Sequence, residues 1–208
     1  MSAIREELVR AVLNKSYALI DYKIHDNVHK RHEFRQKTIF ADESLAKDEK
    51  TYAIKRLNED YDLNKILRNE GEKRICEICS QECLATLYCE ICVRNYLKAN
   101  FSNWTSGNDN IDNLIQKCQM ETLAPDMVVE WIPYNKLQNV KYLTKGGFSE
   151  IYTAIWIDGG YEEWDPKEQQ LIRTGSINVV LKRLENVENA NQHWLEEVCN
   201  LKVFERKH

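Results

Sequence analysis

Apolar residues recur at helical spacing, among many charged ones, through the first third of the chain. Ile4, Leu8 and Val12 are four positions apart and fall on one helical face. A second apolar run begins after Ser44, which is a suitable N-cap. The pattern predicts an antiparallel pair of helices over residues 1–71, with solvated charged faces. The alternative is an oligomerising or partner-binding coiled coil, although the apolar spacing is too irregular for clean heptads.

The pattern changes after Pro125 from helical spacing to short runs of β-branched and aromatic residues. Before that point, residues 102–126 combine a polar turn with a short amphipathic helix, and they are predicted to form a linker. The short runs predict strands at 128–132, 140–143, 151–156 and 177–181. A polar, acidic stretch at 158–176 is predicted to be a long hairpin loop, and a helix is predicted at 192–204. The fold class is therefore expected to be α+β.

Composition and charge narrow the classes of function. Hydrophobic residues make up 43% of the 208 positions and charged residues 30%, which is typical of a folded protein. No apolar run approaches the ~18 residues of a membrane span, so no membrane partner is expected. The N-terminus has no apolar segment of the kind found in secretory signals, which predicts an intracellular protein. A net charge of −4 makes nucleic acid an unlikely partner.

Cysteine is the residue type with the most uneven distribution. Two Cys-x-x-Cys pairs occur nine residues apart, and the pairs are Cys76 with Cys79 and Cys89 with Cys92. Four thiolates at this spacing suit a tetrahedral Zn²⁺ ion, which is borderline-soft and accepts sulfur ligands. Because all four positions are filled by protein, the prediction is a closed structural zinc site in a zinc-ribbon or treble-clef-like unit over residues 72–101.

Two alternatives to this zinc site remain open. In the first, the thiols form disulfides or stay unliganded, although clustered thiols in a reducing compartment more often bind metal. Cys83 lies between the two pairs and is a substitute ligand. Residues 76–100 carry three acids and two bases, a poor match to the phosphates of nucleic acid.

A glycine-containing turn and a lysine define a second candidate site. The turn is Gly146-Gly147-Phe148-Ser149, and strands are predicted before and after it. Small residues in such a turn allow backbone N–H groups to approach phosphates. Further along, Lys182 ends the apolar run Val179-Val180-Leu181, where a lysine is costly unless it is paired. Glu197 lies on the helix predicted at 192–204 and is a candidate partner for this lysine.

Residues 137–204 resemble the N-lobe of eukaryotic protein kinases, with the glycine loop, the strand lysine and the helix glutamate in the same order. The resemblance implies an antiparallel sheet plus one helix that bind ATP with Mg²⁺. It implies that Lys182 holds the α- and β-phosphates and that Glu197, or Glu196 if the match shifts by one, pairs with it. The remaining ATP-binding positions that it implies are Leu143, Gly146, Gly147, Phe148, Ser149, Ile151 and Val180.

The sequence departs from the kinase pattern at three places. Thr144 and Ser149 replace the first and third loop glycines, and Val180 replaces the usual alanine over the adenine. The threonine restricts the turn, and the valine narrows the pocket. The layout is also similar to fungal kinase-like proteins, in which a charged helical segment and a Cys-x-x-Cys unit precede the kinase domain.

The predicted domains are a charged helical segment at 1–71, the Cys unit at 72–101, the linker at 102–126 and an incomplete kinase N-lobe at 127–208. The sequence contains no catalytic loop with its Asp base and no Asp-Phe-Gly motif for Mg²⁺. We therefore expect ATP binding, and no phosphoryl transfer by these 208 residues alone. The alternative function is a zinc-containing module that binds protein partners through the helical segment or the Cys unit and carries a relic half-kinase domain.

Overall fold

The computed structural model describes residues 3–145 and 149–184. The chain divides into two compact units, Met1–Cys89 and Glu90–His208, and each is described by itself. The division falls between two residues of the predicted Cys unit. The predicted α+β class is confirmed, because helices and small antiparallel sheets both occur.

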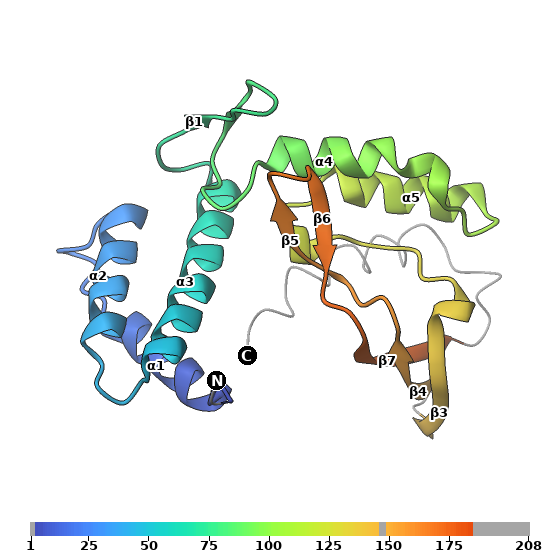
Figure 1. Cartoon of the computed structure of the whole chain (residues 1–208), viewed down its shortest axis with the longest axis horizontal. Coiled ribbons are helices and arrows are strands. Elements are labelled where there is room, and N and C mark those ends of the chain that lie inside the picture. The colour runs from blue at the N-terminus through green and yellow to red at the C-terminus, as the bar shows by residue number, and fades with distance from the viewer. Residues whose placement is uncertain (1–2, 146–148, 185–208) are drawn as a thin grey trace. The chain divides into compact units, whose positions relative to one another are not determined.

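Three helices, rather than the predicted pair, form most of the first unit (Figure 1). They are α1 (Glu6–Ala18), α2 (Val28–Ala41) and α3 (Lys47–Arg68). The prediction of two helices was wrong because the chain breaks between α1 and α2 without glycine or proline. Asp21 accepts a hydrogen bond from the Lys23 N–H within this break, and the Asn27 side chain caps α2 by accepting from the Lys30 N–H at 2.9 Å.

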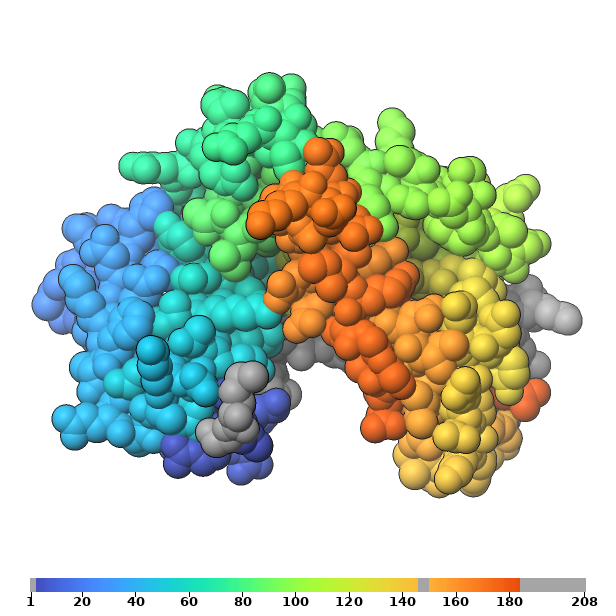
Figure 2. Space-filling view, in the orientation of Figure 1, coloured from blue at the N-terminus to red at the C-terminus, as the bar shows by residue number. Residues whose placement is uncertain are grey.

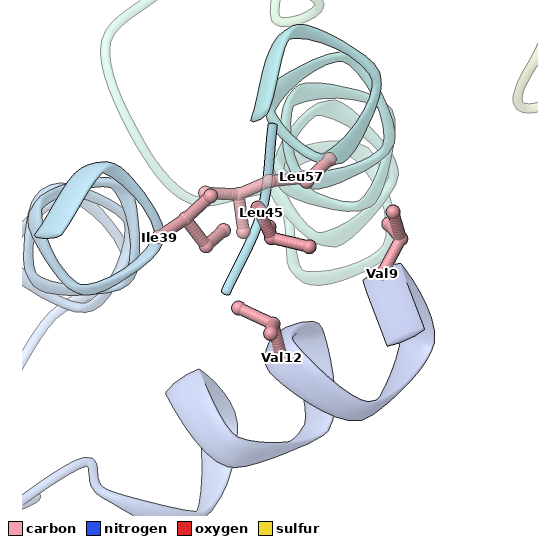
Figure 3. Close-up of a cluster of buried hydrophobic side chains, with 6 residues drawn as sticks. Val9, Val12, Ile39, Leu45 and Leu57 are labelled. Carbon is pink, nitrogen blue, oxygen red and sulfur yellow. The ribbon is translucent and has the colours of Figure 1, made fainter. Parts of the chain in front are cut away.

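The three helices share one hydrophobic core. Figure 3 shows Val9 and Val12 of α1 facing Ile39 of α2 and Leu57 of α3, with Leu45 of the α2–α3 connection between them. These side chains are 0 to 5% exposed. Burying each one contributes about 1.5–3 kcal/mol relative to leaving it in water. In the space-filling view, the three helices appear in blue and cyan with their side chains packed together (Figure 2).

A buried carboxylate joins the beginnings of α1 and α3. Arg5 donates from Nε and Nη2 to the two oxygens of Glu49, each at 2.7 Å. Glu49 also accepts a hydrogen bond from the backbone N–H of Ala46, just before α3, at 2.8 Å. The hydrogen bond from the Arg5 side chain, followed by that from Ala46, lowers the pKa of Glu49 to about 2.

Replacing Glu49 by glutamine is expected to remove a pH-dependent part of the stability. The folded-state pKa of Glu49 lies below its ordinary value of 4.5, so its stabilising effect is complete above pH 4.5 and is lost as the pH falls towards about 2. Urea unfolding should therefore show a gap between wild type and Glu49→Gln at pH 6 that narrows below pH 4.5. The exposed Glu43→Gln is the matched control, and an equal gap for both variants would contradict the prediction.

The first unit ends in a small hairpin that follows α3. Strands β1 (Arg74–Ile75) and β2 (Glu82–Cys83) pair antiparallel, with Arg74 opposite Cys83. In Figure 1 this hairpin lies beyond the C-terminal end of α3. It holds the first Cys-x-x-Cys pair in its turn.

The second unit begins with two helices. Helix α4 (Glu90–Ala99) packs against α5 (Asp109–Met120), and the 3₁₀ turns η1 (Phe101–Asn103), η2 (Pro125–Met127) and η3 (Tyr134–Lys136) connect the elements that follow. Arg94 of α4 donates from Nε and Nη2 to the Thr122 carbonyl at 3.1 and 3.0 Å. This guanidinium fixes the chain just after α5.

Two antiparallel sheets complete the second unit. One has three strands in the order β3-β4-β7, which are β3 (Leu137–Lys145), β4 (Ser149–Trp156) and β7 (Ile177–Leu184). The other pairs β5 (Tyr161–Asp165) with β6 (Gln170–Arg173). The prediction of a long hairpin loop at 158–176 was therefore wrong, since this stretch contains two strands of its own. Trp164 and Leu171 are buried in it, 8% and 6% exposed, and supply the apolar contacts that its acidic composition concealed.

The strand predicted at 128–132 does not form; the structure assigns no strand to these residues. Side chains take the place of a neighbouring strand. Gln119 donates to the Val129 carbonyl at 2.8 Å, and Glu130 forms an ion pair with Arg173 at 2.5 Å. Val128 is only 3% exposed, so the apolar pattern correctly indicated that this residue is buried. It did not show that the segment lacks the backbone hydrogen bonds of a β-sheet.

Gly159 begins the β5–β6 hairpin at a place where no other residue fits. Its φ is +63°, and an added Cβ would lie 2.0 Å from the Gly175 carbonyl oxygen. This close approach of two backbones brings the ends of the hairpin together, and the Thr174 N–H donates to the Gly160 carbonyl there at 2.9 Å.

None of the helices in the described part of the chain combines the length and the apolar composition of a membrane-spanning helix.

Candidate functional site: a four-cysteine metal centre

The first Cys-x-x-Cys pair lies in a tight backbone knuckle. The Ser80 N–H donates to the Cys76 carbonyl at 2.8 Å, and the Cys76 N–H donates to the Gln81 carbonyl at 2.9 Å. Ser80 has a φ of +56°, which turns the chain sharply after Cys79. The knuckle therefore brings Cys76 and Cys79 onto the same side of the β1–β2 hairpin.

The second pair lies where a helix begins. Cys89 precedes α4, and Cys92 is in its first turn. The N-terminal end of a helix carries a partial positive charge and unpaired N–H groups, which favour a thiolate over a thiol. The structure therefore has a hairpin knuckle followed by a pair at the beginning of a helix, and the choice between a zinc-ribbon and a treble-clef-like unit stays a prediction.

The four sulfur atoms converge. Cys76, Cys79, Cys89 and Cys92 have Sγ atoms that all lie within 4.8 Å of one another, and Cys79 Sγ is 3.7 Å from Cys89 Sγ. A Zn²⁺ ion with bonds of about 2.3 Å to a tetrahedron of sulfurs places them about 3.8 Å apart. A disulfide requires about 2.05 Å. The 3.7 Å between Cys79 and Cys89 is too long for a disulfide, and the spacing of the four sulfurs fits a shared metal ion.

Cys83 is close to this group without being one of the four. It is 2% exposed, and its sulfur lies within 4.8 Å of ligand atoms of Cys89 and Glu90. Cys83 therefore lies next to one of the four cysteines, and its role as a substitute ligand stays a prediction. The structure adds Glu90, a residue the sequence reasoning did not select.

A buried ion pair on α3 holds the loop between the two cysteine pairs. Asp62 is completely buried and accepts hydrogen bonds from the backbone N–H groups of Thr86 and Leu87, both at 2.7 Å. It also accepts from the Thr86 hydroxyl at 2.8 Å. Lys65, 1% exposed, lies 3.0 Å from Asp62 and donates to the Leu84 carbonyl. One turn of α3 therefore satisfies four polar groups of a loop that has no regular structure.

Arg74 holds the same loop from the hairpin. Its Nε donates to the Ala85 carbonyl at 2.7 Å, and its Nη2 donates to the Tyr88 carbonyl at 2.5 Å. With Asp62 and Lys65, this guanidinium binds one backbone polar group of each residue from 84 to 88. Three charged side chains therefore hold this part of the loop between the cysteine pairs.

Sequence reasoning missed all three of these residues. The buried face of α3 ends in Asp62 and Lys65, whereas the apolar Leu67 is 51% exposed. A signal was present, because an Asp and a Lys three positions apart on an otherwise apolar face satisfy each other. Reading them as part of a solvated face concealed their role.

The second candidate site is the three-stranded sheet of the second unit. The register of β4 against β7 places Ile151 opposite Lys182 and Thr153 opposite Val180. Directly opposed residues in an antiparallel pair share a face, so Ile151, Val180 and Lys182 lie on the same side of the sheet. Val180 is 67% exposed, and Lys182 is also exposed. Leu143, from β3, is 58% exposed.

A comparison of the chain with protein-family models, curated proteins and solved structures finds no match. The functional argument therefore rests on the residues and their geometry.

Part of the predicted nucleotide site lies outside the described residues. Gly146, Gly147 and Phe148 of the loop belong there, and so does Glu197 with its neighbour Glu196. Ser149 begins β4. Lys182 was expected in a buried strand, whereas the structure places it on an exposed face where a cationic side chain carries no burial cost.

Proposed function

We propose that this chain is part of a nucleotide-binding, protein-kinase-like protein whose Cys unit is folded around a structural zinc ion. Nucleotide binding is the activity proposed for the three-stranded sheet. The zinc ion is proposed for the four-cysteine cluster. The two proposals rest on different residues, and each has its own test.

The zinc proposal is supported by the convergence of four thiols in a stretch with short strands and few buried apolar side chains. Strands β1 and β2 have two residues each. The ligands Cys76, Cys89 and Cys92 are 2 to 5% exposed, so protein surrounds the site. Four protein ligands leave no open position for substrate, and the ion would act as a crosslink rather than as a catalyst.

Metal analysis of the purified chain is expected to find one zinc per chain. Cys79→Ser alone should lower this content only in part if Cys83 replaces the lost thiol, whereas Cys79→Ser with Cys83→Ser should abolish it. Cys83→Ser alone is the control and should retain the metal. Wild-type protein without zinc after purification free of chelators would refute the proposal.

The nucleotide proposal is carried by the register of β4 against β7. In a kinase N-lobe, the residues that cover the adenine and the lysine that holds the phosphates face the same side of the sheet. The same side here carries Ile151, Val180 and Lys182, and the strand order β3-β4-β7 is that of three consecutive antiparallel strands. The β5–β6 hairpin would then be an insertion between the second and third of these strands.

Mg-ATP at about ten times its Kd is expected to raise the Tm by about 3 to 6 °C. Lys182→Ala should abolish this shift, because it removes the cation proposed to hold the phosphates. Arg183→Ala is the matched control: it is the next residue, points to the opposite face and is also exposed, so it should leave the shift intact. No shift at millimolar Mg-ATP, or equal losses in both variants, would contradict nucleotide binding on this face.

The second candidate function is a zinc-containing module that binds a protein partner. It is favoured by the way the first unit combines its own hydrophobic core with the anchored Cys loop. Such a unit can present a rigid binding surface to a partner without help from the three-stranded sheet of the second unit. The test is a stable complex with a protein partner. This function would be supported over nucleotide binding if wild type and Lys182→Ala both form the complex and Cys79→Ser with Cys83→Ser does not.

A further inference from the structure

The helical part of the first unit contains a pocket that neither proposal uses. Its volume is about 120 Å³, and it lies among α2, α3 and the segment that joins α1 to α2. At about 30 Å³ for each water, this is room for roughly four waters or one small polyatomic ion. Leu57 and Val28 supply an apolar, buried part of the wall.

The lining of this pocket is strongly cationic. It includes Arg31 and Arg35, which are one turn apart on α2, and Arg68 in the last turn of α3. None of the lining residues, all within the described part of the chain, is an Asp or Glu. Asp60, which is not part of the lining, is the carboxylate whose charge acts on Arg35. Three arginines that line one space bring like charges near one another, and an anion between them would offset this repulsion.

Two of these arginines are held in place by neutral groups. Arg31 lies over the Tyr22 ring, 5.8 Å from its centroid, and donates to the Asp26 carbonyl at 3.2 Å. Arg35 lies over the Tyr17 ring at 5.7 Å and donates from Nε to the Ser16 hydroxyl at 3.2 Å. Stacking on aromatic rings orients a guanidinium without neutralising its charge. Such arginines are pre-organised to bind oxygen atoms of an anion.

His32 adds a buried polar atom without a partner. Its ring lines the pocket and stacks on Tyr61, with centroids 4.0 Å apart, and its Nδ1 is buried with no hydrogen-bond partner in the structure. Burial, followed by the charge of Arg35, lowers the pKa of His32 to about 4. The other charged or titratable groups that act on it are His29 of α2 and, from α3, Asp62 and Lys65. An anion in the pocket would oppose this shift and favour the imidazolium.

We propose that this pocket binds a phosphoryl group, either as free phosphate or on a phosphorylated side chain. Three guanidiniums from two helices match an anion that presents three oxygen atoms, whereas a carboxylate has two in one plane. Tyr17 and Tyr22 also line the pocket and are 58% and 54% exposed, so part of the lining is in contact with solvent.

The test titrates the full chain with inorganic phosphate, a phosphoserine peptide and its unphosphorylated form, at constant ionic strength. Binding is followed by calorimetry, and the His32 imidazole is followed by NMR. Phosphate should bind and raise the pKa of His32 above its starting value of about 4. Arg68→Gln should weaken binding about tenfold, since it removes one charge-assisted contact. Arg56→Gln, an exposed arginine of the same helix outside the pocket, is the matched control.

Comparing the three ligands distinguishes the two sources of the phosphoryl group. A phosphopeptide that binds at least about tenfold more tightly than phosphate identifies a phosphorylated side chain, and equal affinities identify the free ion. The proposal is overturned if ~10 mM phosphate and phosphopeptide both leave His32 unchanged. Equal binding of the two peptides, or equal effects of Arg68→Gln and Arg56→Gln, would also overturn it. Arg31→Gln provides a second variant with the same expected loss of phosphate binding.

Because nucleotides carry phosphates, Mg-ATP binding must be assigned to one of two places. Mg-ATP binding that is lost in Arg68→Gln but kept in Lys182→Ala would be assigned to this pocket.

Discussion

Removal of the proposed zinc ion is expected to unfold residues 72–92 while α1, α2 and α3 stay helical. The buried side chains of this stretch are few, and four of them are the thiols of Cys76, Cys83, Cys89 and, at its end, Cys92. Apparent binding free energies of structural zinc are about 10–16 kcal/mol, as large as the whole stability of a small domain. The three helices have a separate hydrophobic core that contains none of these cysteines.

Trypsin cleavage after Arg74 is the measurement that isolates this local unfolding. In the folded state the Arg74 guanidinium is occupied by the Ala85 and Tyr88 carbonyls. A strong chelator should therefore make the peptide bond after Arg74 rapidly cleavable by trypsin. The far-UV circular dichroism spectrum should retain most of its helical signal. Added zinc should restore protection, and added magnesium should not. Unchanged cleavage in protein shown to be metal-free would contradict the prediction.

Replacing Asp62 by alanine is expected to cost about 3–5 kcal/mol, the second large effect. The change leaves the Lys65 ammonium, 2% exposed, without its carboxylate and removes the acceptor for two backbone N–H groups of the Cys loop. Leaving such groups unpaired costs more than the net value of the bonds themselves. Denaturant unfolding followed by circular dichroism measures the loss.

A second variant separates the lost ion pair from lost packing. Asp62→Leu with Lys65→Met removes both charges together and should recover part of the stability, because no buried charge remains unpaired. Exposed Asp48→Ala, on the same helix, is the control and should change stability by less than about 1 kcal/mol. An Asp62→Ala variant as stable as this control would show that the contacts of Asp62 contribute nothing to the free energy of unfolding.

The parts of the fold that depend on local spacing were predictable. The two Cys-x-x-Cys pairs, a knuckle followed by a helix, and the strands that became β3, β4 and β7 all follow from the order of a few neighbouring residues. The role of Asp62 was not predictable in this way, because its partners Thr86 and Leu87 lie 24 and 25 positions further along the chain. A charged residue on a helix is usually solvated, and only the tertiary contact shows otherwise.

Two errors have specific physical causes. The β5–β6 hairpin was read as a loop because its acids, such as Glu162 and Glu163, concealed the buried Trp164. Residues 128–132 were read as a strand because burial of Val128 gives the same apolar signal whether the backbone partner is a strand or a side chain. Pattern alone reports burial and leaves the hydrogen-bond partner undetermined.

The bonds that Asp62 accepts also change how the Cys loop should exchange its amide protons with solvent. Loop amides normally exchange among the fastest in a protein, since small local fluctuations expose them. The N–H groups of Thr86 and Leu87 are instead directed to a carboxylate that is itself fully buried on α3. Their exchange requires the loop to separate from the helix. These two amides would therefore be protected like those of a core helix and would report the opening of the loop between the cysteine pairs.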